Sequence, residues 1–153
     1  MNELIIRRAE ISDAAILVEH NLKMALETED FHLNALTVSA GVLAALQEES
    51  GATYYVAEQD GKVFGQLMVT LEWSDWRNGP IWWIQSVYVE PACRRRGVFR
   101  KLLAYIKDIG EVAGAVGFRL YVEAGNGGAQ ETYRCLGFVN SPYLMMELSD
   151  SVG

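Results

Sequence analysis

The stretch "VYVEPACRRRGVFRKLL", residues 87–103, contains two different patterns of apolar residues. Its first part closes the run "IWWIQSVYV", residues 81–89, which is apolar at odd and even positions alike, as in a strand buried on both faces. After Gly97, apolar side chains recur at the spacing of an amphipathic helix that extends to about residue 113. The stretch therefore predicts a central strand that leads through a short loop into a long helix.

The loop at this junction is strongly basic, although the chain carries a formal net charge of −7. The first-turn N–H groups of a helix lack intrahelical acceptors, and the helix dipole adds positive potential there. Arginine offers planar donors to phosphate oxygens, and a glycine lets backbone donors approach a ligand closely. These features favour a phosphate or pyrophosphate site, with a solvated basic loop as the alternative. The cations are Arg94, Arg95, Arg96, Arg100 and Lys101.

The composition of the chain limits which kind of protein it is and which partners it can bind. The chain has 153 residues, half of them hydrophobic and 22% charged, which is typical of one folded domain spanning residues 1–153. A sequence pI near 4.8 argues against nucleic acid or an anionic membrane as the partner. Cys93 and Cys135 lie far apart and outside any metal-binding spacing, so we expect no metal and a reducing, cytoplasmic location. We see no signal peptide and no apolar run of membrane-spanning length.

The rest of the chain alternates between strand and helix patterns, which predicts one mixed α/β domain. Ser12 is positioned to cap the first helix at its N-terminus. We expect strands at 3–9, 52–58, 62–73, 81–89, 118–124 and 143–149, and helices at 13–29, 37–49, 97–113 and 126–137.

The basic loop contains neither a P-loop nor a dinucleotide-binding fingerprint. It resembles instead the acetyl-CoA-binding signature of the GNAT family of N-acetyltransferases, R/Q-x-x-G-x-G/A at a strand-to-helix junction. Arg94 and Gly97 match this signature, and Phe99 departs from it by standing where the family usually has Gly or Ala.

A second segment, "NGGAQETYRCLGF", is similar to the family's downstream signature, N-x-x-A-x-x-x-Y-x-x-x-G-F. Both signatures occur in the family's order, and the flanking patterns agree with its fold over nearly the whole chain. The resemblance implies a mixed, mostly antiparallel sheet with two splayed parallel strands in its middle and helices on both faces. The matching residues are Asn126, Ala129, Tyr133, Gly137 and Phe138.

The resemblance also implies acetyl-CoA as co-substrate. Its pantetheine arm would lie between the splayed strands and pair with the backbone at Val87, Tyr88 and Val89. Asn126, next to Ala129 in the motif, would hydrogen-bond the same arm. The pyrophosphate would be held by the loop residues Arg94, Arg95, Arg96, Gly97, Val98, Phe99 and Arg100.

For the chemistry, the resemblance assigns Tyr133 as the general acid that protonates the departing thiolate, a role that a phenol can fill at neutral pH. A backbone N–H near Val87 or Tyr88 would stabilise the oxyanion. The general base stays open between Glu72, Asp75, Glu123 and ordered water.

The acceptor amine is not identified by any motif. Four tryptophans around one hairpin, together with Glu72 and Asp75, would suit a cationic or aromatic amine, although hairpin tryptophans are more often core or interface residues. They are Trp73, Trp76, Trp82 and Trp83.

Two functions from different classes follow. The first is an N-acetyltransferase that moves an acetyl group to a primary amine of a small molecule or protein by direct attack in a ternary complex. The second is a non-catalytic acyl-CoA-binding regulatory module with the same fold. Related domains are often dimers, which leaves a homodimer open.

Overall fold

The computed structural model describes residues 3–148, which fall into two compact units with a boundary between Tyr121 and Val122. The main unit, up to Tyr121, contains a five-stranded sheet and three α-helices. Its elements are β1 (Ile5–Arg8), α1 (Ala14–Glu29), α2 (Ala35–Leu46), β2 (Thr53–Gln59), β3 (Lys62–Ser74), β4 (Gly79–Val89), α3 (Val98–Val112) and β5 (Gly117–Leu120). The C-terminal unit contains one helix, α4 (Gly127–Cys135).

The strands of the sheet follow chain order, β1-β2-β3-β4-β5. The pairs from β1 to β4 are antiparallel, and short turns join β2 to β3 and β3 to β4, whereas α1 and α2 lie between β1 and β2. β5 follows a helix and pairs with β4 in parallel. The mixed α/β class and the mostly antiparallel sheet predicted from the sequence are therefore confirmed.

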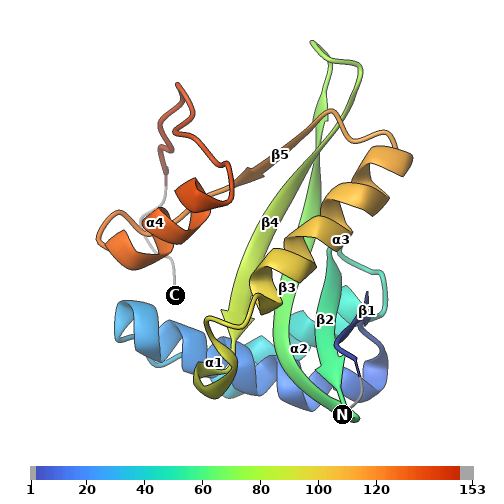
Figure 1. Cartoon of the computed structure of the whole chain (residues 1–153), viewed down its shortest axis with the longest axis vertical. Coiled ribbons are helices and arrows are strands. Elements are labelled where there is room, and N and C mark those ends of the chain that lie inside the picture. Colours follow the sequence, from blue (N-terminus) through green and yellow to red (C-terminus); the bar gives the residue numbers. More distant parts are fainter. Residues whose placement is uncertain (1–2, 149–153) are drawn as a thin grey trace. The chain divides into compact units, whose positions relative to one another are not determined.

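Helices cover both faces of this sheet (Figure 1). Alternation along β3 shows which helix covers which face: Gly65 lies against Val98 of α3, while the next residue, Gln66, contacts His20 of α1. The helical spacing read after Gly97 is confirmed, because one stripe of α3 is buried. The buried stripe comprises Val98, Leu102, Leu103 and Ile106, and burying a leucine or isoleucine side chain contributes about 1.5–3 kcal/mol.

The predicted cap of the first helix is wrong. A short 3₁₀ turn, η1 (Ile11–Asp13), precedes α1, and the N–H of Glu10 donates to the Asp13 carboxylate at 2.7 Å. Asp13, not Ser12, is therefore the side chain that satisfies a backbone donor at this helix start. Arg7 of β1 also reaches Asp13, with two hydrogen bonds of 2.8 and 3.0 Å.

The C-terminal strand predicted at 143–149 is also wrong for residues 143–148, and Ser149 lies outside the described residues. A strand needs a hydrogen-bonded neighbour, and the apolar residues Leu144, Met146 and Leu148 are each more than nine-tenths exposed. The strand expected at 118–124 is the shorter β5, which forms an edge of the sheet described here rather than its middle.

We predict that Asp13→Asn lowers the free energy of unfolding by about 1–3 kcal/mol, because Arg7 loses a charged acceptor at a site that is 7% exposed. The hydrogen bond from Arg7 holds the pKa of Asp13 below its ordinary value, although burial opposes this. The stabilisation is therefore full above the unfolded-state pKa, about 4, and is lost as the pH falls through the lower folded-state pKa.

Chemical denaturation across this acid range measures the effect. Asp60→Asn, in the exposed turn between β2 and β3, is the control and leaves the pH dependence unchanged. A pH-independent difference between Asp13→Asn and the parent chain would contradict the role of the carboxylate.

Candidate active site

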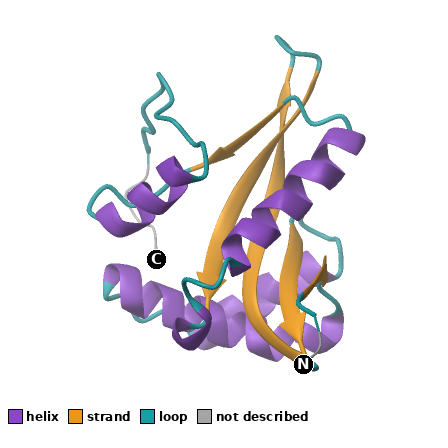
Figure 2. Ribbon diagram, in the orientation of Figure 1, coloured by secondary structure: helices purple, strands orange, loops and turns teal. Residues whose placement is uncertain are grey.

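The two parallel strands β4 and β5 separate part-way along their length (Figure 2). They pair only from Ile81 with Gly117 to Ile84 with Leu120. β4 continues to Val89 while remaining paired with β3 on its other side. Backbone groups of β4 beyond Ile84 therefore face a side from which β5 has departed, as expected for the splayed strands.

A β-bulge lies in this same segment of β4. Gln66 of β3 pairs with Tyr88, and Met68 pairs with Gln85, so Ser86 and Val87 together lie opposite the single residue Leu67. Ser86 has φ of 51°, in the left-handed region that residues other than glycine seldom adopt. Such a bulge turns the local N–H and C=O groups out of the regular strand pattern.

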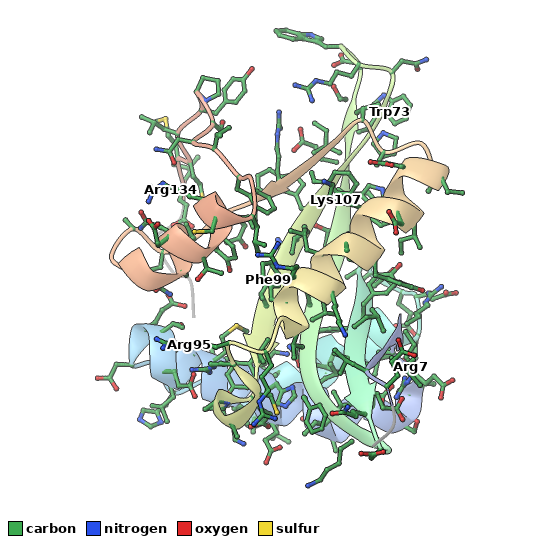
Figure 3. The ribbon with its side chains drawn as sticks, viewed as in Figure 1. Arg7, Trp73, Arg95, Phe99, Lys107 and Arg134 are labelled. Atoms are coloured by element: carbon green, nitrogen blue, oxygen red, sulfur yellow. The ribbon has the colours of Figure 1, made fainter. Side chains whose placement is uncertain are left out.

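β4 leads through a 3₁₀ turn, η2 (Pro91–Cys93), into the basic loop and α3. Arg95 and Gly97 both have left-handed backbones, with φ of 65° and 78°. Figure 3 shows Arg95 in this loop and Phe99 in the first turn of α3. The N–H of Lys101 donates to the carbonyl of Gly97, so the earlier N–H groups of the helix start form its anion-attracting end.

Apart from Gly97 and its immediate chain neighbours, no atom of the described residues lies within 4 Å of the position that a Cβ on Gly97 would occupy. Space is therefore open beside the loop, and the side chains of Arg95, Arg96 and Arg100 are exposed. Phe99 is half-buried and does not fill the space beside Gly97. The loop fits a phosphate-bearing group in both charge and room.

In the C-terminal unit, the residues of the second signature organise α4. Asn126 caps the helix by accepting the N–H of Ala129 at 3.1 Å, and Gly137 has φ of 101°, which favours glycine. The ring of Tyr133 packs edge-on against Phe138, with centroids 5.9 Å apart. Burial raises the pKa of the Tyr133 phenol. The unit thus presents a tyrosine that keeps its proton at neutral pH.

The acetyltransferase (GNAT) family matches residues 18–138, most of the chain and both signatures. The chain belongs to the GNAT family. Among proteins of curated function, none matches the chain.

Solved structures agree with this assignment. A possible acetyltransferase from Clostridium difficile 630 is 40% identical, with 99% of this chain and 100% of that chain covered and a TM-score of 0.91. AAC(6')-Iy in complex with the bisubstrate analogue CoA-S-monomethyl-acetylneamine is 20% identical, with 98% of this chain and 100% of that chain covered and a TM-score of 0.76. A transcriptional regulator from Bacillus halodurans C-125 is 16% identical, with 97% of this chain and 100% of that chain covered and a TM-score of 0.81. The last two share the fold.

The arginine that begins the GNAT signature, Arg94, is engaged within the protein. It donates to the carbonyl of Val89 at 2.8 Å and to the carboxylate of Glu27 on α1 at 2.7 Å, and its guanidinium lies 5.4 Å from the centre of the Tyr88 ring. Tyr88 donates its hydroxyl to the same carboxylate at 3.0 Å. Arg94 therefore ties the end of β4 to α1, which the motif alone did not reveal.

The three carboxylates proposed as bases lie in different surroundings. Glu72 of β3 accepts the indole N–H of Trp83 at 2.7 Å and lies 3.6 Å from the guanidinium of Arg119. Asp75 lies in the exposed turn between β3 and β4. Glu123, in the C-terminal unit, accepts the N–H of Gly125. Of these three, Glu72 is the one held beside an aromatic surface.

The tryptophans do not form a single wall. Trp82 is buried against Phe118, on the face of the sheet that α3 covers, whereas the next residue, Trp83, lies on the opposite face beside Tyr121 with ring centroids 6.0 Å apart. Trp73 and Trp76 are exposed near the tip of the hairpin, where Figure 3 labels Trp73. Of the four tryptophans, Trp83 is the one that donates to Glu72, and Tyr121 packs beside it.

Sequence reasoning missed two buried polar residues behind the bulge, His20 and Gln66, both 0% exposed. The signal available was a polar residue within an otherwise apolar stretch.

Within residues 3–148, no group of three or more His, Cys, Asp or Glu side chains is placed to bind a metal ion. In the same described part of the chain, no helix has the length and apolar character needed to cross a membrane.

We predict that Glu27→Gln lowers the pKa of Tyr88 from about 12 toward its ordinary value. Burial raises this pKa most, and the hydrogen bond and negative charge of Glu27 raise it further, so the amide removes the second contribution. NMR titration of ring-labelled tyrosine measures it. Glu29→Gln, at the exposed end of the same helix, is the control and leaves the Tyr88 titration where it is. An unchanged Tyr88 pKa in Glu27→Gln would contradict this contact.

Proposed function

We propose that this GNAT protein is an acetyl-CoA-dependent N-acetyltransferase that transfers an acetyl group to a primary amine of a small molecule or protein. One observation carries the proposal. The strand edge that β5 leaves, beyond Ile84, leads directly into the basic N-terminal end of α3. An extended amide-bearing arm attached to a pyrophosphate matches this combination, and the neighbour AAC(6')-Iy was solved with a CoA analogue.

In this proposal the backbone of Val87, Tyr88 and Val89 pairs with the pantetheine amides, in the manner of an added strand. The N–H groups from Arg95 to Arg100, with the exposed arginine side chains, hold the pyrophosphate. Asn126 uses its carbonyl oxygen to cap α4, and its amide N–H remains the group to assign to the pantetheine arm.

For the transfer step, the neutral amine attacks the thioester carbonyl directly. The new carbon–nitrogen bond gives a tetrahedral oxyanion, and as this collapses the carbon–sulfur bond breaks and Tyr133 donates its proton to the departing sulfur. The raised pKa of Tyr133 supports this role because a general acid must hold its proton until transfer. The amine's proton leaves to a base, for which ordered water, Glu72, Asp75 and Glu123 stay as candidates.

The acceptor class that the main unit suits best is a cationic amine with an apolar or aromatic body. Glu72 offers negative charge beside the rings of Trp83 and Tyr121, which together could attract an ammonium group before deprotonation.

We also propose that both units form one acetyltransferase domain, because the family match runs across the boundary at Tyr121. The free thiols Cys93 and Cys135 suit a cytoplasmic enzyme, and sedimentation would measure a homodimer.

The competing function is a non-catalytic acyl-CoA-binding regulator. A structural neighbour is named a transcriptional regulator, so the fold alone does not imply catalysis. Two measurements separate the functions: calorimetric titration with acetyl-CoA, with NAD as the matched control, and release of free thiol in the presence of a panel of amines. Binding of acetyl-CoA with thiol release supports the enzyme, and binding without release supports the regulator.

We predict that Gly97→Val weakens acetyl-CoA binding about tenfold or more, because a β-branched residue cannot keep φ of 78° without strain and the loop N–H groups turn away. Gly61→Val is a matched control. Gly61 has the same φ of 78° and the same open surroundings, but it lies in the turn between β2 and β3. Calorimetry measures both variants, and equal affinities would contradict the pyrophosphate assignment.

We predict that Tyr133→Phe lowers kcat by about 10²–10⁴-fold while leaving the affinity for acetyl-CoA nearly unchanged, because only the proton donor is removed. Steady-state kinetics and calorimetry together measure this. Tyr143→Phe, an exposed tyrosine of the same unit, is the control. A variant that binds weakly yet turns over normally at saturation would show that Tyr133 acts in binding instead.

A further inference from the structure

The β4 bulge places a serine in an unfavourable backbone conformation beside the candidate thioester site. Ser86 has φ of 51°, and such a residue keeps this conformation only where its surroundings hold it there. A few buried polar residues of the main unit hold Ser86 in this conformation.

A buried chain of hydrogen bonds ends on the carbonyl of Ser86. The Gln66 amide donates to this oxygen at 3.1 Å, and its own carbonyl oxygen lies 3.1 Å from Nδ1 of His20. The other ring nitrogen of His20, Nε2, lies 2.9 Å from a carboxylate oxygen of Glu90, the residue directly after β4. Gln66 and His20 are both 0% exposed, so water cannot replace these bonds.

A second set of buried groups reaches the side chain of the same serine. Burial raises the pKa of the Tyr54 hydroxyl, and side-chain hydrogen bonds with Asn21 and with Ser86 partly oppose this rise. Asn21 donates to that hydroxyl at 3.1 Å. Residues of α1, β2 and β3 thus converge on one bulged residue of β4, from both its carbonyl and its hydroxyl.

The direction of the first chain fixes where its protons lie. The Ser86 carbonyl can only accept, so the Gln66 NH₂ must face it and the Gln66 carbonyl must face His20. Nδ1 of His20 therefore carries a proton. Because Glu90 offers a carboxylate to Nε2, that second bond also needs a proton, held between the imidazole and the carboxylate. A neutral imidazole facing an ionised Glu90 would set two acceptors against each other.

Other charged and aromatic groups surround this pair. Lys23 of α1 lies 3.7 Å from the same Glu90 oxygen, and the Tyr88 ring lies 5.0 Å from the His20 ring, centre to centre. Beyond Tyr88 is the Glu27–Arg94 pair, whose charges oppose each other. The Glu90 carboxylate thus contacts the His20 ring and lies near the Lys23 ammonium group.

We propose that His20 and Gln66 are positioning residues: they hold the Ser86 bulge so that the N–H groups of Val87 and Tyr88 face the thioester oxygen. This rests on the proposed function. Neither side chain touches substrate in the proposal. Their effect passes through the Ser86 carbonyl to the backbone.

Two substitutions of His20 separate its two bonds. His20→Asn places an amide NH₂ near the position of Nδ1 and keeps the donor to Gln66, whereas His20→Gln places it near Nε2 and keeps only the contact with Glu90. We expect His20→Gln to lower kcat about 10- to 100-fold more than His20→Asn, with little difference in KM for acetyl-CoA, since a small misplacement of oxyanion donors has this size of effect. Chemical denaturation confirms that both variants are folded under assay conditions. Equal kcat values would overturn the positioning role.

The network also has a test that does not depend on turnover. Nitrogen-15 NMR of the His20 ring in the wild type should show a proton on Nδ1, and the Val87 and Tyr88 amide signals should shift more in His20→Gln than in His20→Asn. A ring with its proton on Nε2 alone would overturn the network itself. A wild type that releases no thiol contradicts the proposed function, whereas an active wild type with indistinguishable His20 variants contradicts only the positioning role.

Discussion

The separation of β4 from β5 is the constraint on which the candidate site depends. Among the described residues, parallel pairing holds the two strands together from Ile81 to Ile84, and beyond that point β4 has no paired strand on that side. A strand edge with unpaired backbone groups normally invites another chain to pair with it. In this protein the edge runs into the N-terminal end of a helix, so what it favours is a ligand that combines amides with a phosphate-bearing end.

The interior of the main unit supports that edge from behind. The sheet is covered on one face by the apolar stripe of α3, as is usual for an amphipathic helix. On the other face, α1 brings His20 and Asn21 into the core next to Gln66. Buried polar groups cost stability unless every one is hydrogen-bonded, and in exchange they fix one arrangement of the atoms they bind. Here the atoms so fixed belong to Ser86, at the point where the regular strand is interrupted.

Electrostatics divides the basic loop into two roles. Arg94 turns back onto Val89 and Glu27, which anchors the loop to the strand and to α1. Arg95, Arg96 and Arg100 stay exposed and give the helix start its positive field. The first arginine thus makes the loop rigid, and the other three make it attractive to an anion. An acidic chain can in this way hold one local anion site without attracting polyanions in general.

The sequence by itself determined the elements and the family. Strand and helix patterns predicted every strand and α-helix of the described residues, because alternation and helical spacing are local properties of the chain. They also predicted a last strand that residues 143–148 do not form. Two signatures, around Gly97 and Tyr133, were sufficient for the GNAT assignment that the family match confirms. Only the tertiary structure revealed the partners of Arg94 and the buried chain from Glu90 through His20 and Gln66 to Ser86. These contacts join residues up to 70 positions apart, and such distances are closed by packing, which leaves no local pattern to read.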